Sequence, residues 1–288
     1  MVVRVQCLSG AVRSMLKVAV CLVVAAVTVM ALSGLAGTTA DALPGHPETS
    51  CQPDTPGNDP CAGATGPIGE NSCNGDDACV DSSGQIGDGS CIGDDACTDS
   101  SSSISNGSCI REYACYESSS DIGDGSCIGD YACYNSDASI GDDSCNGRAA
   151  CPASSSQIGD GSCIGFEACV DSESQIGDDS CIGDYACADS SSRIGDDSCN
   201  GWVACPASSS QIGDGSCIGE EACVESSGSI GDGSCIGDYA CFDSSGSIGD
   251  DSCIGFEACY ESSSDIGDCE FNVSRCAPRL PYPEIVNA

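Results

Sequence analysis

Paired cysteines are the residues of this chain whose type and spacing define chemistry most clearly. Their first members recur every 18 residues from Cys73 to Cys253, and a partner follows each after five intervening residues. The pairs are Cys73 and Cys79, Cys91 and Cys97, Cys109 and Cys115, Cys127 and Cys133, Cys145 and Cys151, Cys163 and Cys169, Cys181 and Cys187, Cys199 and Cys205, Cys217 and Cys223, Cys235 and Cys241, and Cys253 and Cys259. Structural zinc sites use shorter C-x2-4-C spacings, often with histidine, and the only histidine is His46, outside the repeats. The pattern therefore favours structural disulfides.

Two disulfide pairings are compatible with this spacing. If each 18-residue repeat forms one coil of a stack, the first cysteines of the pairs form one column and the second cysteines form another. Each column holds eleven cysteines, so bonds between neighbouring coils within one column leave one cysteine unpaired. Bonds within a repeat leave none. Against pairing within a repeat, positions six apart in a regular triangular coil lie on different edges, beyond the ~4.4–6.8 Å between Cα atoms that a disulfide needs. Stacked positions lie within ~5 Å of each other. We favour pairing within each repeat.

Acidic residues form a second regular set. We number the residues of each repeat from 1 to 18, starting at the isoleucine that recurs at Ile68 and Ile86. Acidic residues then recur at position 3, where Asn106 is an exception. Stacked carboxylates ~4.8 Å apart would repel by about 1 kcal/mol in water. Calcium prefers carboxylate and carbonyl oxygens, so it is the candidate cofactor. The hypothetical ligands are Asp88, Asp124, Asp142, Asp160, Asp178, Asp196, Asp214, Asp232 and Asp250. The alternative is that these acids only solvate exposed faces and prevent edge association.

Aromatic residues occupy the middle of the second six residues of several repeats. They are Tyr113, Tyr131, Phe166, Tyr185, Trp202, Tyr239 and Phe256. One hypothesis is an exposed strip that grips a polysaccharide or a protein partner. The other is that these side chains merely cover a corner of the coil, because scattered surface aromatics are ordinary.

The composition excludes several classes of protein. With 37 glycines, 28 cysteines, 4 phenylalanines and 1 tryptophan in 288 residues, the chain cannot build an ordinary apolar core. A formal net charge of -37 with 8 lysines and arginines argues against nucleic-acid binding. No repeat carries a singular nucleophile, base and orienting group, so we expect no enzyme activity.

The first 42 residues read as a secretory signal peptide. Arg4, Arg13 and Lys17 precede a long apolar run, and small residues at 40–42 allow cleavage after Ala42. A retained membrane anchor is the alternative reading of this run. We expect a secreted or cell-surface protein whose mature part does not insert stably into membranes.

An 18-residue period without insertions predicts the architecture. Such strict spacing is typical of a solenoid, in which each repeat is one coil. We expect an all-β, disulfide-rich parallel β-solenoid of about eleven coils at residues 68–265, preceded by a linker or cap at 43–67 and followed by a cap and tail at 266–288. A 54-residue period, visible in the matching segments from Asn146 and Asn200, suggests duplication of three coils.

Each coil divides into three sixes, as in "IGDGSC", "IGDYAC" and "FDSSGS" at 230–247. This pattern resembles the hexapeptide repeat of left-handed β-helices, which implies glycine at corners with positive φ. Strand alternation in "S-C-I" would turn isoleucine inward and cysteine outward.

The C-x5-C spacing is similar to that of disulfide-braced insect antifreeze solenoids. The similarity implies bonds across each coil, with Cys51 and Cys61, and Cys269 and Cys276, closing the two ends. The threonine ladder of that family is absent, and Thr98 is the only threonine inside the coils.

These observations favour a secreted or cell-surface structural or adhesive repeat protein, acidic and calcium-stabilised. One alternative is an ice-binding protein, which the fold analogy alone suggests. Another is a repetitive scaffold whose surface binds a protein or glycan partner.

Overall fold

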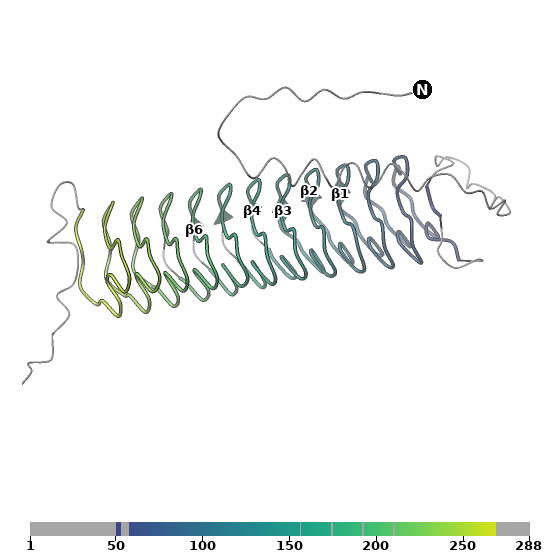
Figure 1. Ribbon diagram of the computed structural model, residues 1–288. Coiled ribbons are helices and arrows are strands. Elements are labelled where there is room, and N and C mark those ends of the chain that lie inside the picture. Colours follow the sequence, from purple (N-terminus) through teal and green to yellow (C-terminus); the bar gives the residue numbers. More distant parts are fainter. Residues whose placement is uncertain are drawn as a thin grey trace, which may run out of the picture. The chain divides into compact units, whose positions relative to one another are not determined.

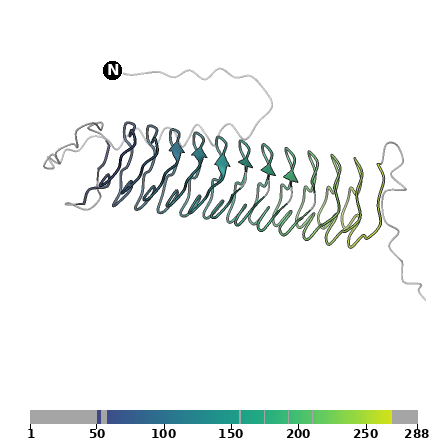
Figure 2. The same cartoon turned by 180° about the vertical axis from the view of Figure 1, so that it is seen from behind.

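The described part of the chain forms a stack of short coils (Figure 1). The computed structural model describes residues 50–52, 58–155, 157–173, 175–191, 193–209 and 211–268. Each coil spans one 18-residue repeat, and consecutive coils lie side by side in both views (Figures 1 and 2). None of these described residues is helical. The expected all-β, parallel, disulfide-rich solenoid is confirmed.

One side of the stack is a parallel six-stranded sheet in the order β1-β2-β3-β4-β5-β6. Its strands are β1 (Ser103–Ile104), β2 (Asp121–Ile122), β3 (Ser139–Ile140), β4 (Gln157–Ile158), β5 (Gln175–Ile176) and β6 (Arg193–Ile194). Each residue pairs with the residue 18 positions later, as Ile104 does with Ile122. Isolated bridges carry the same register to both ends, from Ile68 to Ile266. The isoleucine at position 1 is buried, and the residue before it is exposed.

The other sides of the coil are less regular than the sheet. Single parallel bridges join position 7 of neighbouring coils, as between Ile92 and Ile110, and positions 9–14 form turns. Non-glycine residues at positions 4, 6, 10 and 14 adopt left-handed φ angles, as Asp179, Cys181, Tyr185 and Asp189 do at 52–58°. The hexapeptide resemblance, with three equivalent sides, is therefore not confirmed. A general repeat solenoid describes the coil.

The cysteines point into the coil, contrary to the alternation expected for a strand. All the paired cysteines from Cys73 to Cys259 have no exposed surface. Alternation does not apply because Cys91 and its equivalents have a left-handed φ near 55°, which turns the chain at that residue. Ser90 and Cys91 are both buried as a result, and Ile92 is half-buried.

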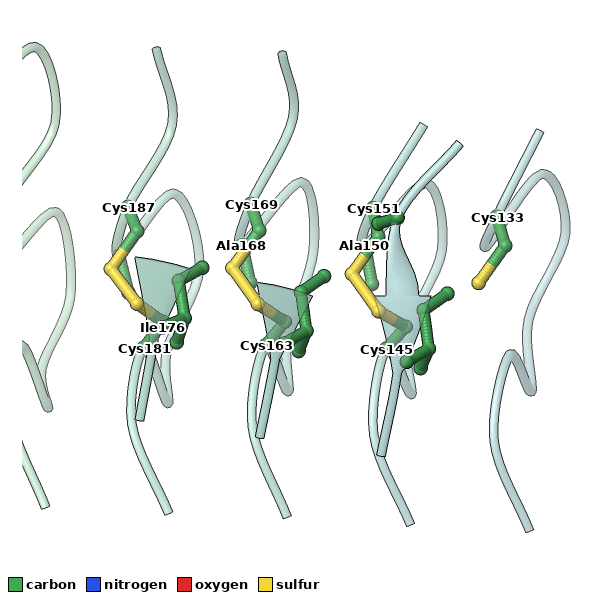
Figure 3. Packing of buried hydrophobic residues seen from close by; sticks show 14 of the residues in the cluster. Cys133, Cys145, Ala150, Cys151, Cys163, Ala168, Cys169, Ile176, Cys181 and Cys187 are labelled. Carbon is green, nitrogen blue, oxygen red and sulfur yellow. A yellow bond between two sulfur atoms is a disulfide. The ribbon is translucent and has the colours of Figure 1, made fainter. Parts of the chain in front are cut away.

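A disulfide crosses every coil. Cys163 and Cys169, for example, are bonded with a Cα–Cα distance of 5.6 Å, and each of the eleven C-x5-C pairs has this connection at 5.5–5.6 Å. Figure 3 shows these disulfides in a column, with alanines of position 11 beside them. The coil can hold positions six apart so closely because it is not a regular triangle. Its left-handed residues fold the segment between the two cysteines back on itself.

Glycine has two different roles in the coil. At position 8, as in Gly219, it adopts a positive φ of 143°, as expected for a corner. At position 2 the expectation was wrong, because Gly213 and its equivalents do not have a left-handed φ. There the neighbouring coil is the constraint. A Cβ on Gly213 would lie 2.7 Å from the backbone nitrogen of Asp232 and 2.8 Å from the carbonyl carbon of Gly231.

The N-terminal side of the stack begins with part of a further coil. Cys51 and Cys61 form a disulfide with a Cα–Cα distance of 5.7 Å. Cys51 donates its N–H to the carbonyl of Ser72, the same bond that Cys73 makes with Ser90 in the next coil. Cys51 also has the left-handed φ of the first cysteine in a regular pair. Cys51 therefore corresponds to position 6 of a coil. Its partner Cys61 follows ten residues later, compared with six in the regular coils.

The other predicted end features lie partly outside the described residues. At the C-terminal side the position-1 column continues to Ile266 and the position-3 column to Asp268. Cys269, Cys276 and the predicted signal peptide at 1–42 are not among the described residues. Within the described ranges, the structure has no helix with the length and apolarity needed to cross a membrane.

Two substitutions in one coil separate the two constraints on glycine. We expect Gly213→Ala to lower the free energy of unfolding by about 1–3 kcal/mol, because its methyl group would overlap the backbone of the next coil. Gly215→Asn should change it by less than about 0.5 kcal/mol, because Gly215 has open space around it and Asn71 adopts the same left-handed φ at this position. Urea unfolding of the oxidised proteins, followed by circular dichroism, measures both. Equal losses would contradict the proposed steric origin.

Candidate functional site: acidic ladders and aromatic columns

The position-3 side chains form a continuous ladder along the stack. The Oδ1 atom of Asp196 accepts the backbone N–H of Asp178 at 3.0 Å, and Asp214 accepts the N–H of Asp196 at 3.1 Å. The same bond recurs for every predicted ligand, namely Asp88, Asp124, Asp142, Asp160, Asp178, Asp196, Asp214, Asp232 and Asp250. These side chains are exposed, so the structure brings them together in one surface column.

Asn106 accepts the same kind of hydrogen bond as the acids of this ladder. Asn106 accepts the N–H of Asp88 at 2.8 Å and donates its own N–H to Asp124 at 2.8 Å. The ladder thus needs a side-chain oxygen at this distance from the backbone rather than a negative charge. An unpaired N–H at this turn would otherwise have to be satisfied by water. This structural use of the carboxylates was not anticipated from the sequence.

Some position-9 carboxylates bind the preceding coil in the same way. Asp184 accepts the N–H of Phe166 at 2.8 Å, and Asp238 accepts the N–H of Glu220 at 3.1 Å. These bonds fix the orientation of carboxylates that lie beside the aromatic residues of the second six.

A buried serine column is a further structural element that sequence reasoning missed. Serine occupies position 5 of all eleven coils and is completely buried. The hydroxyl of Ser162 donates to the carbonyl of Gly177 at 2.7 Å and accepts the N–H of Ser180 at 3.0 Å. The signal was available in the sequence, because no other residue type occurs at this position. Hydroxyls inside the coil therefore join neighbouring repeats without leaving polar groups unpaired.

The aromatic side chains gather in columns rather than in one strip. Tyr113 stacks on Tyr131 with ring centroids 5.1 Å apart, and Tyr116 stacks on Tyr134 at 5.4 Å. The two columns also touch each other edge to face, between Tyr113 and Tyr116. The second column, at position 13, was not included among the candidate aromatics.

Carboxylates surround these rings. The pKa of Tyr113 lies above its usual value because its hydroxyl hydrogen-bonds to Asp95 and feels that negative charge. A similar group forms near the C-terminal side, where Phe242 stacks on Tyr260 at 5.3 Å and Tyr239 contacts Phe256. The pKa of Tyr239 is also raised, chiefly by the charge of Glu221. Each aromatic group thus lies in a strongly negative environment.

A shallow groove of about 630 Å³ follows the sheet side of the stack. Its floor is the Ile-Gly backbone of positions 1 and 2, as at Ile212 and Gly213. Its lining includes Gln175, Arg193 and Gln211 from position 18, and the carboxylates of position 3. The exposed residues of position 18 differ from coil to coil, so the sheet presents no uniform array of side chains.

Comparison with known families gives one match. The model of a family described as Domain of unknown function (DUF7640) matches residues 36–132, 125–218 and 189–278. The chain belongs to this family. No curated protein and no solved structure matches the chain.

The three DUF7640 matches do not correspond to three separate structural units. Consecutive matches overlap at residues 125–132 and 189–218, and the parallel bridges continue through both overlaps. The matched residues that the structure describes therefore belong to one continuous solenoid, and the middle match, residues 125–218, corresponds to about five 18-residue repeats. The family description assigns no activity, so functional arguments rest on the columns described above.

The disulfides of this DUF7640 solenoid do not form a metal centre. Neighbouring coils bring three sulfur atoms within 4.8 Å of one another, as in Cys145, Cys151 and Cys163. Each of these sulfurs is already in a disulfide, whereas metals bind the thiolate form. The sulfur column is structural.

Substitutions at Asp196 test whether the ladder needs an acceptor or a charge. Asp196→Asn should leave stability unchanged or slightly higher, because the amide oxygen can still accept the N–H of Asp178 and one repulsive charge is removed. Asp196→Ala should cost about 1 kcal/mol, the typical value of a lost hydrogen bond. Denaturant unfolding and hydrogen exchange of the Asp178 amide measure these effects. An equal loss for both variants would show that charge is required.

Proposed function

We propose that this protein is an extracellular structural scaffold with an acidic, adhesive surface. The observation that carries the proposal is the repetition of one bonding pattern from the coil of Ile86 onward: a crossing disulfide, a buried serine and a position-3 acceptor. Disulfides persist in oxidising compartments, which supports secretion or display at the cell surface. The predicted signal peptide at 1–42 supports it further.

The distribution of polar groups favours a scaffold over an enzyme. Catalysis needs a nucleophile, a base and an orienting group at one place. The carboxylates and hydroxyls of the described coils instead recur in columns, and the carboxylates of position 3 and the hydroxyls of position 5 are already engaged in bonds between coils. We therefore propose a non-catalytic role, in which length and surface chemistry matter more than any single residue.

Calcium stabilisation is a secondary part of this proposal. A ladder residue such as Asp196 uses Oδ1 for a backbone N–H, and the side chain as a whole remains exposed. The other oxygen could bind a divalent cation and reduce repulsion between adjacent coils. The hydrogen bonds between coils hold the position-3 side chains in place without calcium, so bound calcium would further stabilise coils that are already joined.

The ice-binding alternative has less support. Ice-binding solenoids of the resembling family use a uniform threonine ladder, whereas the exposed ends of β1–β6 carry serine, aspartate, glutamine and arginine. No observation in the described sheet favours ice binding over a scaffold. The alternative in which the surface binds a protein or glycan partner is compatible with the scaffold and concerns its aromatic columns.

Deletion of residues 146–199 tests the scaffold proposal. The deletion removes three whole coils and joins Cys145 to Asn200, so Cys145 can pair with Cys205 in the same C-x5-C spacing. We expect the shortened chain to be exported, to contain no free thiols and to be shorter by about 14 Å, from three strand spacings of about 4.8 Å.

Thiol titration of the medium fraction and small-angle X-ray scattering measure these outcomes, with the full chain as the control. Recovery of the full chain inside the cell with reduced cysteines would contradict the extracellular role. Misfolding of the shortened chain would contradict interchangeable coils.

Thermal unfolding in millimolar calcium and in chelator tests the secondary proposal. If cations bind the position-3 ladder of the folded chain, the melting temperature should rise with calcium concentration. The rise should be smaller in Asp196→Asn, which keeps the hydrogen bond and removes a charge. Identical melting curves with calcium and chelator would restrict the ladder to its role as backbone acceptor.

A further inference from the structure

Trp202 is an exposed aromatic ring between two carboxylates. It occupies position 9 of its coil and exposes 51% of its surface. The same position holds Asp184 in the preceding coil and Glu220 in the next. These coils are in register, because Val203 donates its N–H to the backbone carbonyl of Asp184 and Glu221 donates its N–H to the backbone carbonyl of Trp202. Strand spacing places the three residues about 4.8 Å apart along the column.

The carboxylate before Trp202 is held in place. Asp184 accepts the N–H of Phe166 at 2.8 Å, so its orientation does not depend on a ligand. Within the described residues, no other aromatic ring pairs with Trp202, unlike Phe166, which contacts Tyr185. The largest aromatic side chain of the coils thus lies at the surface, one coil after a carboxylate whose orientation is fixed by the Phe166 N–H of the coil before it.

The chain itself shows what such a position can bind. In the same column, the guanidinium of Arg148 lies over the ring of Phe166, with its central carbon 5.5 Å from the ring centroid. The distance is within the ~6 Å range of a cation–π contact. Arg148 comes one coil before Phe166 and Asp184 one coil after it. An arginine, an aromatic ring and a carboxylate therefore already form one sequence along position 9.

Trp202 differs from Phe166 in one respect: carboxylates occupy position 9 of both neighbouring coils, so no arginine lies next to the ring in this column. The chain supplies little positive charge of its own: the arginines and lysines of the described coils are Arg111, Arg148 and Arg193, against a net charge of -37 for the whole sequence. Indole is the strongest cation–π partner among side chains. A cation for this site must come from another molecule.

We propose that Trp202, Asp184 and Glu220 form a docking site for an arginine-rich segment of a partner protein. A guanidinium would stack on the exposed indole, as Arg148 does on Phe166, and pair with a neighbouring carboxylate. Arginine fits better than lysine because its planar group can stack and hydrogen-bond at once. The surrounding acidic columns would attract further basic residues of the same segment.

The proposal names the class of protein that would bind the adhesive surface of the scaffold, and its biological relevance rests on the proposed scaffold function. The site itself can be tested separately. In the 146–199 deletion, Asp130 would take the place of Asp184 before Trp202, so binding should survive there even if the scaffold proposal fails. A neutral polysaccharide is the competing partner, because it could stack on the indole without using the carboxylates.

The test is a titration of the purified, oxidised full chain with a peptide of eight arginines, and in parallel with one of eight lysines, at physiological salt. Trp202 is the only tryptophan, so its fluorescence reports on this site alone. We expect a fluorescence change with the arginine peptide, and roughly three- to tenfold tighter binding of that peptide than of the lysine peptide.

Three variants, measured by anisotropy of labelled peptides, provide the controls. Trp202→Leu should abolish the preference for arginine, and Trp202→Phe should keep part of it. Asp184→Asn keeps the acceptor for the Phe166 N–H and should weaken both peptides more than Asp214→Asn, which removes one charge from another column. Equal binding of the two peptides, an unchanged Trp202→Leu variant, or a response of Trp202 to a neutral cello-oligosaccharide and not to arginine would overturn the proposal.

Discussion

The short covalent bridge inside each coil is the interaction on which the other features depend. A coil of 18 residues encloses little space, and its interior holds one isoleucine with serine, alanine and two cysteines. So little apolar surface cannot offset the entropy of ordering the backbone, which is why small cores need additional constraints. A disulfide that closes a loop of this size contributes on the order of 2 kcal/mol. Repetition supplies that contribution in every coil, next to a half-turn of left-handed residues that brings the sulfurs together.

Stacking in register then satisfies the backbone. Most N–H groups of a coil donate to a carbonyl of the coil before or after it, as Gly87 does to Ile104 and Cys97 does to Ala78. Several of the remaining N–H groups donate to side chains of a neighbouring coil: to serine hydroxyls inside the coil and to carboxylate or amide oxygens outside it. The position-3 acids therefore stabilise the stack as hydrogen-bond acceptors. The mutual repulsion of the position-3 carboxylates is tolerated because the aspartates from Asp88 onward also accept backbone N–H groups that would be costly to leave unpaired.

The sequence predicted the parts of this structure that depend on period. The 18-residue spacing indicated a parallel solenoid, and Ile86 and its equivalents were expected inside. The local conformation was less accessible, because the strand rule of alternating faces fails wherever one residue has a left-handed φ. Cys91 is such a residue, and its inward direction could not be derived from a pleated strand. Gly213 shows a second limit, since its role depends on an atom of the next coil rather than on its own backbone. The constant serine before each first cysteine was a usable signal, because a single polar residue type at every repeat indicates a fixed partner.

The division between constant and variable positions explains how one frame can carry a specific surface. Positions 5, 6, 11 and 12 are the same in all eleven coils, because each fills the interior or closes the coil. Position 9 varies among Asp, Glu, Arg, Phe and Trp, and its carbonyl accepts the N–H of position 10 in the next coil whichever side chain it carries. A substitution there changes the charge or the aromatic surface at one known place along the stack without altering the core. The side chains of this column can therefore differ from coil to coil within one frame, as the Arg148–Phe166 contact and the exposed Trp202 illustrate.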